Sequence, residues 1–258
     1  MNHMGNPTLF VGWDVGGWNC DRNPSSRDAL VILDADRRLV GTPWRGNLRS
    51  VMNAAHTPDD MIRAVLDLCK VSPRDDEQAS LLFAIDTPLG FSAPFIDLIV
   101  NRQPVDAVME SSSNPYLHRK TEHFLFQKGL SPLSPIKDMI GSQATKGMHF
   151  LARYARDVLS CGVWSDGDRM MAIEAYPSAC KWSAQIEALR RPFYTQERGE
   201  QETERQFRAE LHHVDLQDAL TCALIGWTFM HYPARLAHPP AGIDPVEGWI
   251  FVPLDGLK

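Results

Sequence analysis

Two short apolar stretches that each end in an aspartate decide the fold: Leu9-Phe10-Val11-Gly12-Trp13-Asp14 and Leu81-Leu82-Phe83-Ala84-Ile85-Asp86. Nearly continuous apolar runs of this length are typical of strands that are buried on both faces of a sheet. Gly16-Gly17 follows the first stretch and Thr87-Pro88-Leu89-Gly90 follows the second, so neither strand continues far beyond its acid. The pattern predicts two central strands with carboxylates at their carboxyl ends.

The sequence between these two strands predicts a hairpin and then a helix. Residues 29–34 and 39–43 are strand-like and are separated by a polar turn, which indicates an antiparallel pair. Thr57-Pro58-Asp59-Asp60 is typical of a helix start, since it offers a capping hydroxyl, a proline in the first turn and two acids near the positive end of the helix dipole. We expect this helix to end near Lys70 and to pack its apolar face on the sheet.

The second half of the chain predicts further helices and a third strand that ends in an acid, Met170-Met171-Ala172-Ile173-Glu174. We expect an insertion of short helices and loops over residues 91–140, because that segment has no single periodicity. The remaining expected elements are a helix over 144–160, a charged helix over 197–210, an apolar helix that opens at Asp215-Leu216-Gln217-Asp218 and a strand-like run over 248–253. Together they predict an α/β fold with a mixed central sheet flanked by helices, in a single domain over residues 1–258.

The composition of the chain limits the kinds of molecule that it is expected to bind. A formal net charge of −6 gives no general attraction for phosphate backbones or anionic membranes, so a nucleic-acid partner must be held by a local basic patch. The five cysteines are scattered without a Cys-x-x-Cys pair, which favours a reducing, cytoplasmic setting over a disulfide framework or a zinc site. The longest apolar stretch, over residues 219–230, is too short to cross a bilayer, so no membrane role is expected.

Acids at the ends of several strands point to a metal site. In an open α/β sheet the carboxyl ends of the strands meet at one crevice, so Asp14, Asp86 and Glu174 are expected to converge there. Asp215 and Asp218 share one helix face and are expected to join them. Such a carboxylate cluster needs a positive partner, and Mg²⁺ or Mn²⁺ is the natural one. Metals held in this way can activate water against a phosphodiester.

The order of these motifs resembles the ribonuclease-H-like superfamily, notably its Holliday-junction resolvase branch. More closely, the chain resembles the domain-of-unknown-function family 429, which is described as a predicted nuclease of ribonuclease-H fold. The segments that carry this resemblance are Val11-Gly12-Trp13-Asp14, Ala84-Ile85-Asp86-Thr87-Pro88-Leu89-Gly90, Tyr116-Leu117-His118-Arg119-Lys120-Thr121-Glu122, Glu174-Ala175-Tyr176-Pro177, Asp215-x-x-Asp218-Ala-Leu and Gly248-Trp249-Ile250-Phe251-Val252-Pro253.

The resemblance implies roles for seven side chains. It implies metal ligation by Asp14, Asp86 and Asp218, further catalytic roles for Glu174 and Asp215, and a substrate-binding loop that carries Arg119 and Glu122. One position departs from the family pattern. Members are expected to read Asp-Gly-Cys after the first acid, whereas Val15-Gly16-Gly17 stands here, so the turn at the site is expected to differ.

Structural explanations compete with these roles. Asp215 is equally explained as a helix cap, with Asp218 favoured in the first turn by the helix dipole. Arg119 and Glu122 are spaced as a surface ion pair of small energetic value. Asp14 is explained less well in this way, because an acid at the end of an apolar strand must be solvated, paired or liganded.

Three functions remain open from the sequence. The first is a metal-dependent hydrolase, most simply a nuclease that acts on nucleic acid. The second is a nucleotide-binding protein of the actin-like and sugar-kinase type, in which Asp14-Val15-Gly16-Gly17 would meet phosphates. The third is an interaction module that keeps the fold without catalysis.

Overall fold

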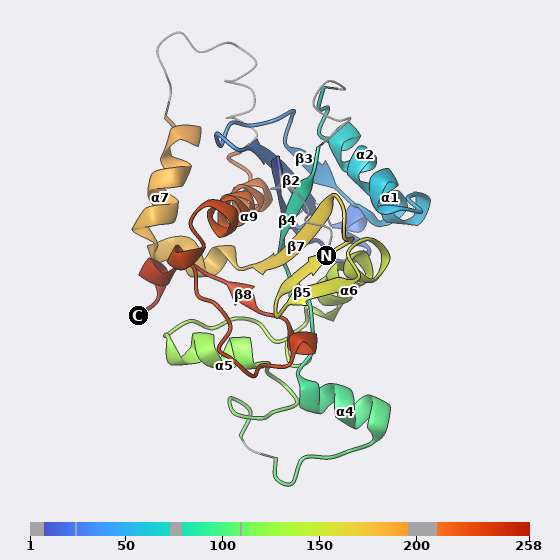
Figure 1. Cartoon of the computed structure of the whole chain (residues 1–258), viewed down its shortest axis with the longest axis vertical. Coiled ribbons are helices and arrows are strands. Elements are labelled where there is room, and N and C mark those ends of the chain that lie inside the picture. The colour runs from blue at the N-terminus through green and yellow to red at the C-terminus, as the bar shows by residue number, and fades with distance from the viewer. Residues whose placement is uncertain (1–7, 24, 73–78, 109, 196–210) are drawn as a thin grey trace.

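A mixed sheet runs through the centre of the molecule, with helices on both sides of it (Figure 1). The computed structural model describes residues 8–23, 25–72, 79–108, 110–195 and 211–258. The strands are β1 (Leu9–Asp14), β2 (Asp28–Asp34), β3 (Trp44–Gly46), β4 (Leu81–Asp86), β5 (Asp157–Ser160), β6 (Val163–Ser165), β7 (Met170–Ala175) and β8 (Ile250–Phe251). Their order is β3-β2-β1-β4-β7-β6-β5, and β8 pairs with β7. The neighbours β1, β4 and β7 are parallel, whereas β2, β3, β5 and β6 each pair antiparallel with their neighbours.

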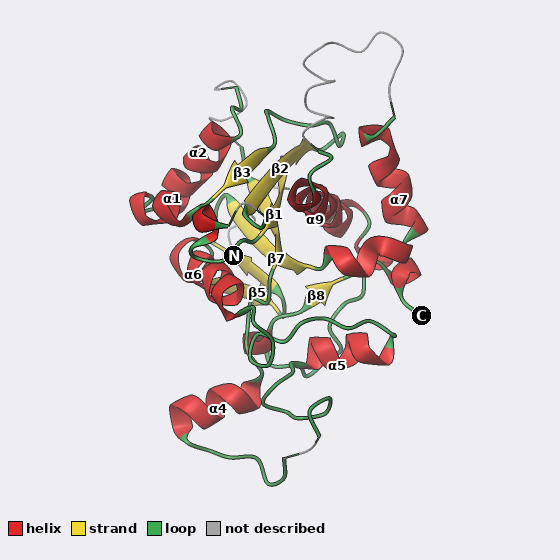
Figure 2. Cartoon of the chain, turned by 180° about the vertical axis from the view of Figure 1, so that it is seen from behind, coloured by secondary structure: helices red, strands yellow, loops and turns green. Residues whose placement is uncertain are grey.

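Helices form the two outer layers and confirm the predicted α/β class. The α-helices of the described residues are α1 (Arg49–Ala54), α2 (Pro58–Leu68), α4 (Ala93–Asn101), α5 (Lys120–Gln127), α6 (Gly141–Tyr154), α7 (Ala184–Arg190) and α9 (Val214–His231). In Figures 1 and 2, α1, α2 and α6 lie on one side of the sheet, and α7 and α9 lie on the other. None of the helices in the described part of the chain is long and apolar enough to cross a membrane.

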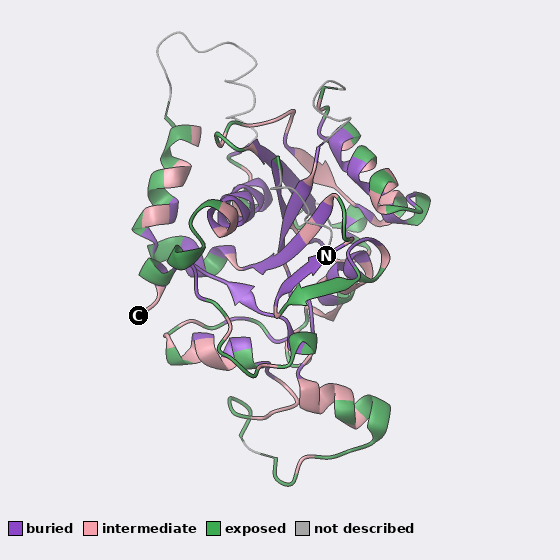
Figure 3. Cartoon of the chain, viewed as in Figure 1, coloured by how far each residue is buried: buried purple, intermediate pink, exposed green. Residues whose placement is uncertain are grey.

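Alternate residues of the central strands enter two different cores. Val11 and Trp13 of β1 pack with α2 and α6, whereas Phe10 packs with α9 on the opposite face. This alternation follows from the two-residue period of a strand. Both faces are covered, which explains why the sequences of β1 and β4 are almost wholly apolar up to their terminal acids. Helix α9 is buried along most of its length (Figure 3).

Helix α9 approaches β1 at Gly12. A Cβ atom at this position would lie 1.8 Å from the backbone oxygen of Ala219 and 2.4 Å from the backbone nitrogen of Ala223. Both obstacles are backbone atoms of a helix, which cannot move aside as a flexible side chain can. Gly12 therefore sets the distance between α9 and the strand that ends in Asp14.

We expect Gly12→Ala to lower the free energy of unfolding by about 1–3 kcal/mol, because the methyl group forces α9 away from a close-packed sheet. Urea denaturation of both proteins measures this difference. Gly141→Ala is the matched control, since a Cβ at Gly141 would find its nearest atom at 3.8 Å. Equal losses in the two variants would show that the close approach of α9 does not matter for stability.

The strand predicted over residues 39–43 is wrong. The partner of β2 is β3, which begins later, and Leu39 forms only an isolated bridge to Leu33. Gly41 adopts a left-handed φ of 69°, and Pro43 has no amide proton to donate to a ladder. The chain therefore turns at these residues before it can rejoin the sheet.

The helix predicted over residues 144–160 is correct only in its first part. Helix α6 ends at Tyr154, and residues 157–160 form the edge strand β5, which pairs antiparallel with β6. Helical spacing of apolar residues does not require a helix where a neighbouring strand offers hydrogen-bond partners. The helix start at Thr57 is confirmed, with a capping box between Thr57 and Asp60. The charged helix expected over 197–210 lies outside the described residues.

Residues 91–140 hold α4 and α5, joined by long loops. Helix α4 lies away from the sheet at the far end of an excursion from the body (Figure 1), and none of its residues is buried. Glu247 fastens both ends of this excursion, because its Oε1 accepts a hydrogen bond from the amide of Ala93 at 3.2 Å and its Oε2 accepts one from the amide of Lys120 at 2.6 Å. The base of the excursion is therefore held beside the carboxyl ends of the parallel strands.

Candidate functional site

The strands that end in acids open on one cavity. Asp14 lies opposite Asp86 in the register of the parallel strands β1 and β4, and Glu174 lies opposite Ile85 in the next pair. Asp14, Asp86 and Glu174 all line a cavity of about 450 Å³. The structure thus brings together three of the acids that the sequence placed at strand ends.

The rest of the cavity wall consists of residues that the sequence reasoning did not select. They include Ser26, Thr87, Gln143, Tyr176 and Ser178. The Oγ1 atom of Thr87 is buried and has no hydrogen-bond partner among the described residues. Thr87 and Tyr176 closely follow the acids of β4 and β7 in the sequence, so their place in the cavity wall could have been predicted. Ser26 and Gln143 lie on distant segments, and nothing in the sequence indicates that they line the cavity.

Burial and repulsion from neighbouring carboxylates raise the pKa values of the two aspartates. The pKa of Asp14 is raised to about 9, first by loss of solvation and then by the charges of Asp86 and Asp218. Burial also raises the pKa of Asp86, and the charges of Asp218 and Glu174 add to this effect. Both side chains remain partly exposed to the cavity. The pair therefore favours a proton or another cation between its oxygens.

These shifts predict an unusual dependence of stability on pH. Between the ordinary aspartate pKa of 3.8 and about 9, the unfolded chain releases the proton of Asp14 while the folded chain keeps it, so stability falls as pH rises. Without metal, we expect the ionisation of Asp14 to lower the free energy of unfolding by about 2 kcal/mol between pH 5 and pH 8. The upper limit for one group is about 1.4 kcal/mol per pH unit, and the expected slope is smaller because the side chain is partly exposed. Urea denaturation with a chelator present measures the slope.

Asp14→Asn should flatten this slope, since the amide does not ionise. Asp36→Asn is the control, because Asp36 is a well-exposed acid whose side chain is 71% accessible. Parallel pH profiles for wild type and Asp14→Asn would contradict the raised pKa of Asp14.

Asp218 and Asp215 lie in the first two turns of α9, but they differ in their surroundings. Asp218 is partly exposed; burial and the charge of Asp215 raise its pKa, while Lys181 lowers it. Asp215 is buried, and its Oδ2 accepts hydrogen bonds from the Arg45 side chain at 2.7 Å and from the amide of Arg27 at 3.1 Å. Neither acid is among the residues that line the cavity.

The interpretation of Asp215 as a helix cap is wrong. The N-cap of α9 is His213, whose Nδ1 accepts a hydrogen bond from the amide of Asp215 at 3.2 Å. Asp215 is instead an acid of the first turn, where the helix dipole favours it, and it forms an ion pair with Arg45. This pair ties the start of α9 to the edge strand β3.

Glu174 is held by a buried ion network. Arg119 donates from Nη2 to Glu174 at 2.6 Å and from Nε to Glu122 at 2.8 Å, and its side chain is 0% exposed. The amide of Leu89 also donates to Glu174 at 2.9 Å. The surface ion pair expected for Arg119 and Glu122 is therefore wrong, because both side chains are fully buried. Neither lines the cavity; they lie behind Glu174 and fix its orientation.

A second buried ion pair was missed by the sequence reasoning. Asp28, at the start of β2, pairs with Lys146 of α6, and both side chains are 0% exposed. Asp28 also accepts hydrogen bonds from the Trp13 indole at 3.1 Å and from the amides of Gly16 at 2.9 Å and Leu48 at 2.6 Å. The pair holds the turn that follows Asp14, where this chain departs from the family pattern.

The acids near the cavity fall into two groups by their partners. Glu174, Asp215 and Asp28 each form an ion pair with a lysine or an arginine. Asp14, Asp86 and Asp218 form none with any described residue, and of these three Asp14 and Asp86 line the cavity. No group of three or more His, Cys, Asp or Glu side chains within the described ranges is arranged to hold a metal ion. The donor set available to a cation at the cavity is therefore the pair Asp14 and Asp86.

Comparison with known proteins adds no family to this description. No family model, no curated protein and no solved structure matches the chain.

Proposed function

We propose that the chain is a metal-dependent phosphodiesterase of ribonuclease-H-like fold that acts on nucleic acid. The observation that carries this proposal is the pair Asp14 and Asp86, which lie side by side on neighbouring parallel strands, line a cavity and have no cationic partner in the described chain. The sheet supports the fold assignment, because antiparallel β3-β2-β1 continues into parallel β4 and β7 in the order in which the sequence motifs resemble that superfamily.

Asp14 and Asp86 have no countercharge among the described residues, which favours a bound metal ion. Glu174, Asp215 and Asp28 are paired with cations of the chain, whereas Asp14 and Asp86 lie side by side without a cationic partner among the described residues. Two carboxylates that face a polar cavity are a suitable donor set for Mg²⁺ or Mn²⁺. Asp14 and Asp86 would hold the ion, and Asp218 is the next acid in reach of their charge. A bound ion of this class supplies an activated water and stabilises a leaving oxygen.

The residues around Asp14 and Asp86 have different roles. Arg119 pairs with Glu174 and orients it at the cavity wall. The Asp28–Lys146 pair fixes the turn after Asp14. The orphan hydroxyl of Thr87 beside Asp86 is free to donate to a bound oxygen.

Metal binding is the first test. We expect Mn²⁺ or Mg²⁺ to raise the melting temperature, since an ion that binds only the folded chain at about 100 times its Kd adds about 2.7 kcal/mol to the stability. Asp86→Asn should abolish this gain, whereas Asp36→Asn, which removes an exposed acid, should keep it. The absence of any metal-induced shift in the wild type would leave only the interaction module.

Cleavage is the second test. Wild type, Asp14→Asn and Asp86→Asn are incubated with Mn²⁺ and a panel of single-stranded, double-stranded and branched DNA and RNA. We expect cleavage of at least one substrate by the wild type and none above background by the variants. Equal cleavage by all three proteins would refute the proposal.

The nucleotide-binding alternative is less well supported by the turn after β1. The amide of Gly16 donates to Asp28 at 2.9 Å, and the amide of Trp18 donates to the hydroxyl of Ser142 at 2.9 Å. These amides are therefore engaged within the chain rather than available to phosphates. ATP binding seen by calorimetry, without cleavage of nucleic acid, would reverse this ranking.

A further inference from the structure

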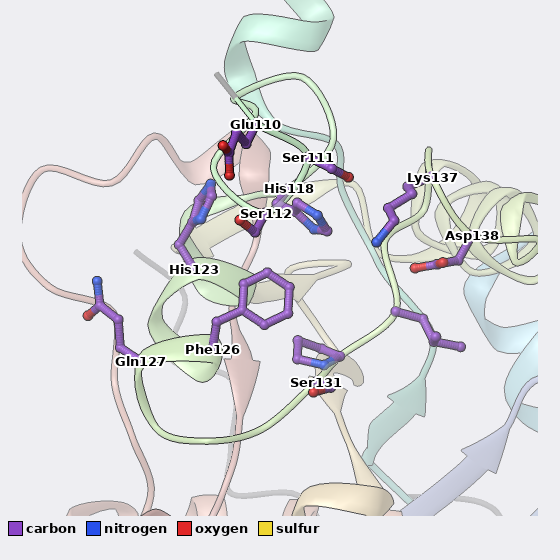
Figure 4. A pocket seen from close by; sticks show the side chains of 12 residues that line it. Glu110, Ser111, Ser112, His118, His123, Phe126, Gln127, Ser131, Lys137 and Asp138 are labelled. Carbon is purple, nitrogen blue, oxygen red and sulfur yellow. The ribbon is translucent and has the colours of Figure 1, made fainter. Parts of the chain in front are cut away.

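A second pocket adjoins the cavity of Asp14 and Asp86. It has a volume of about 810 Å³ and shares the segment 131–133 with the first cavity as a common wall. Figure 4 shows His118, His123 and Phe126 on one side and Lys137 with Asp138 on the other. The two cavities are therefore neighbours on either side of segment 131–133.

His118 is the residue that points to a ligand. It is 3% exposed, yet neither of its ring nitrogens has a hydrogen-bond partner among the described residues. Its ring makes edge-to-face contacts with Phe126 at a centroid distance of 4.9 Å and with His123 at 5.8 Å. A buried polar ring without hydrogen-bond partners costs free energy. A ligand that supplies those partners would recover this cost.

The chemistry of the lining selects a neutral ligand over an anion. Burial lowers the pKa of His118 and also that of His123, so both rings are neutral near pH 7. Among the described residues of the lining, Lys137 is then the one lysine, and it is accompanied by the carboxylates of Glu110 and Asp138. A phosphate would meet more negative than positive charge here.

A planar heteroaromatic group fits the lining better. The rings of His118, His123 and Phe126 offer aromatic surface, and a neutral imidazole has one donor and one acceptor. The carboxylates can accept from an exocyclic amino group, and the serine hydroxyls at 111 and 112 can pair with ring nitrogens or carbonyls. This combination of flat apolar faces and mixed polar groups is what a nucleobase requires.

We propose that this pocket receives a nucleobase that is extruded from a nucleic-acid strand whose phosphate lies beside the metal ion that Asp14 and Asp86 would hold. The position of the phosphate rests on the proposed function. The position of the base rests on the pocket and on the unpartnered ring of His118. A base reaches such a pocket only from single-stranded or distorted nucleic acid, because a paired base stays in its stack. The substrate class is therefore nucleic acid with an unpaired nucleotide beside the cleaved bond.

Free nucleosides test the pocket without metal or cleavage. The nine histidines of the chain are labelled with ¹⁵N, the signals of His118 and His123 are assigned with His118→Gln and His123→Gln, and adenosine, cytidine, guanosine and uridine are titrated with a chelator present. We expect at least one nucleoside to shift both signals, and Lys137→Ala, which changes an exposed side chain of the lining, to weaken that binding. Shifts caused only by ribose or inorganic phosphate, or no shift at all, would overturn the base site.

Bulged duplexes test whether the pocket takes its base from a nucleic-acid strand. In the Asp86→Asn background, a duplex with one unpaired nucleotide is compared with the same duplex carrying an abasic bulge. We expect the abasic form to bind about tenfold more weakly, as for the loss of a stacked base, and His118→Leu to remove the difference. Equal affinities would refute the base site.

The two proposals fail separately. Nucleoside binding in a chain that cleaves no nucleic acid would keep the base site and refute the phosphodiesterase. Metal-dependent cleavage that ignores the abasic substitution would refute the base site alone.

Discussion

Arg119→Met should lower the free energy of unfolding by about 3–5 kcal/mol, because removal of one partner leaves buried charges uncompensated. The guanidinium of Arg119 donates to Glu122 and Glu174 and also to the backbone oxygen of Glu247 at 3.0 Å. Methionine fills most of the volume but offers no donor. Equilibrium urea denaturation of both proteins measures the difference.

Arg63→Met is the matched control, because Arg63 pairs with Asp60 at the surface and its side chain is 64% exposed. Exposed pairs contribute little, so this variant should lose less than about 1 kcal/mol. A combined variant with Arg119→Met, Glu122→Gln and Glu174→Gln should recover part of the loss. Equal losses for Arg119→Met and Arg63→Met would mean that the buried network does not hold this region.

Lys146→Met should cost about 3 kcal/mol or more, and the loss should depend on pH. Lys146 is the cationic partner of the fully buried Asp28, whose pKa is raised by burial and lowered again by Lys146. Without the lysine the folded-state pKa of Asp28 rises further, so stability is kept at low pH and lost as the pH rises towards that value. Denaturation at pH 5 and pH 8 should therefore show the larger loss at pH 8.

Two variants separate this charge effect from lost packing. Lys120→Met removes an exposed lysine and should leave stability unchanged at both pH values. Lys146→Met combined with Asp28→Asn should remove the pH dependence while keeping the loss of contacts. A loss for Lys146→Met that is the same at both pH values would contradict the buried charge of Asp28.

The sequence predicted the strands that form the site, because the signals for them are local. Each of β1, β4 and β7 is an apolar run that ends in an acid and is followed by residues that stop a strand. Strand ends in a parallel arrangement share one edge of the sheet, so the convergence of Asp14, Asp86 and Glu174 followed from the pattern.

The partners of the buried charges could not be predicted in the same way. Glu174 is 55 residues from Arg119, and Lys146 is 118 residues from Asp28. A charged residue in an otherwise apolar segment indicates that a partner exists, but only packing in three dimensions decides which one. The same limit explains why Arg119 and Glu122 were interpreted as a surface pair, since their spacing alone does not reveal the sheet behind them.

The single carboxylate of Glu247 gives the chain a modular construction. Its two oxygens accept hydrogen bonds from the amides of Ala93 and Lys120. The two ends of the intervening segment, which contains α4, are therefore held close together. We therefore expect changes in the length of the segment between Ala93 and His118 to leave the aspartate pair in place. Glu110, Ser111 and Ser112 belong to this segment, whereas Asp14 and Asp86 belong to the fixed sheet. In the proposed phosphodiesterase, selectivity for a base and the chemistry at the phosphate could therefore diverge independently.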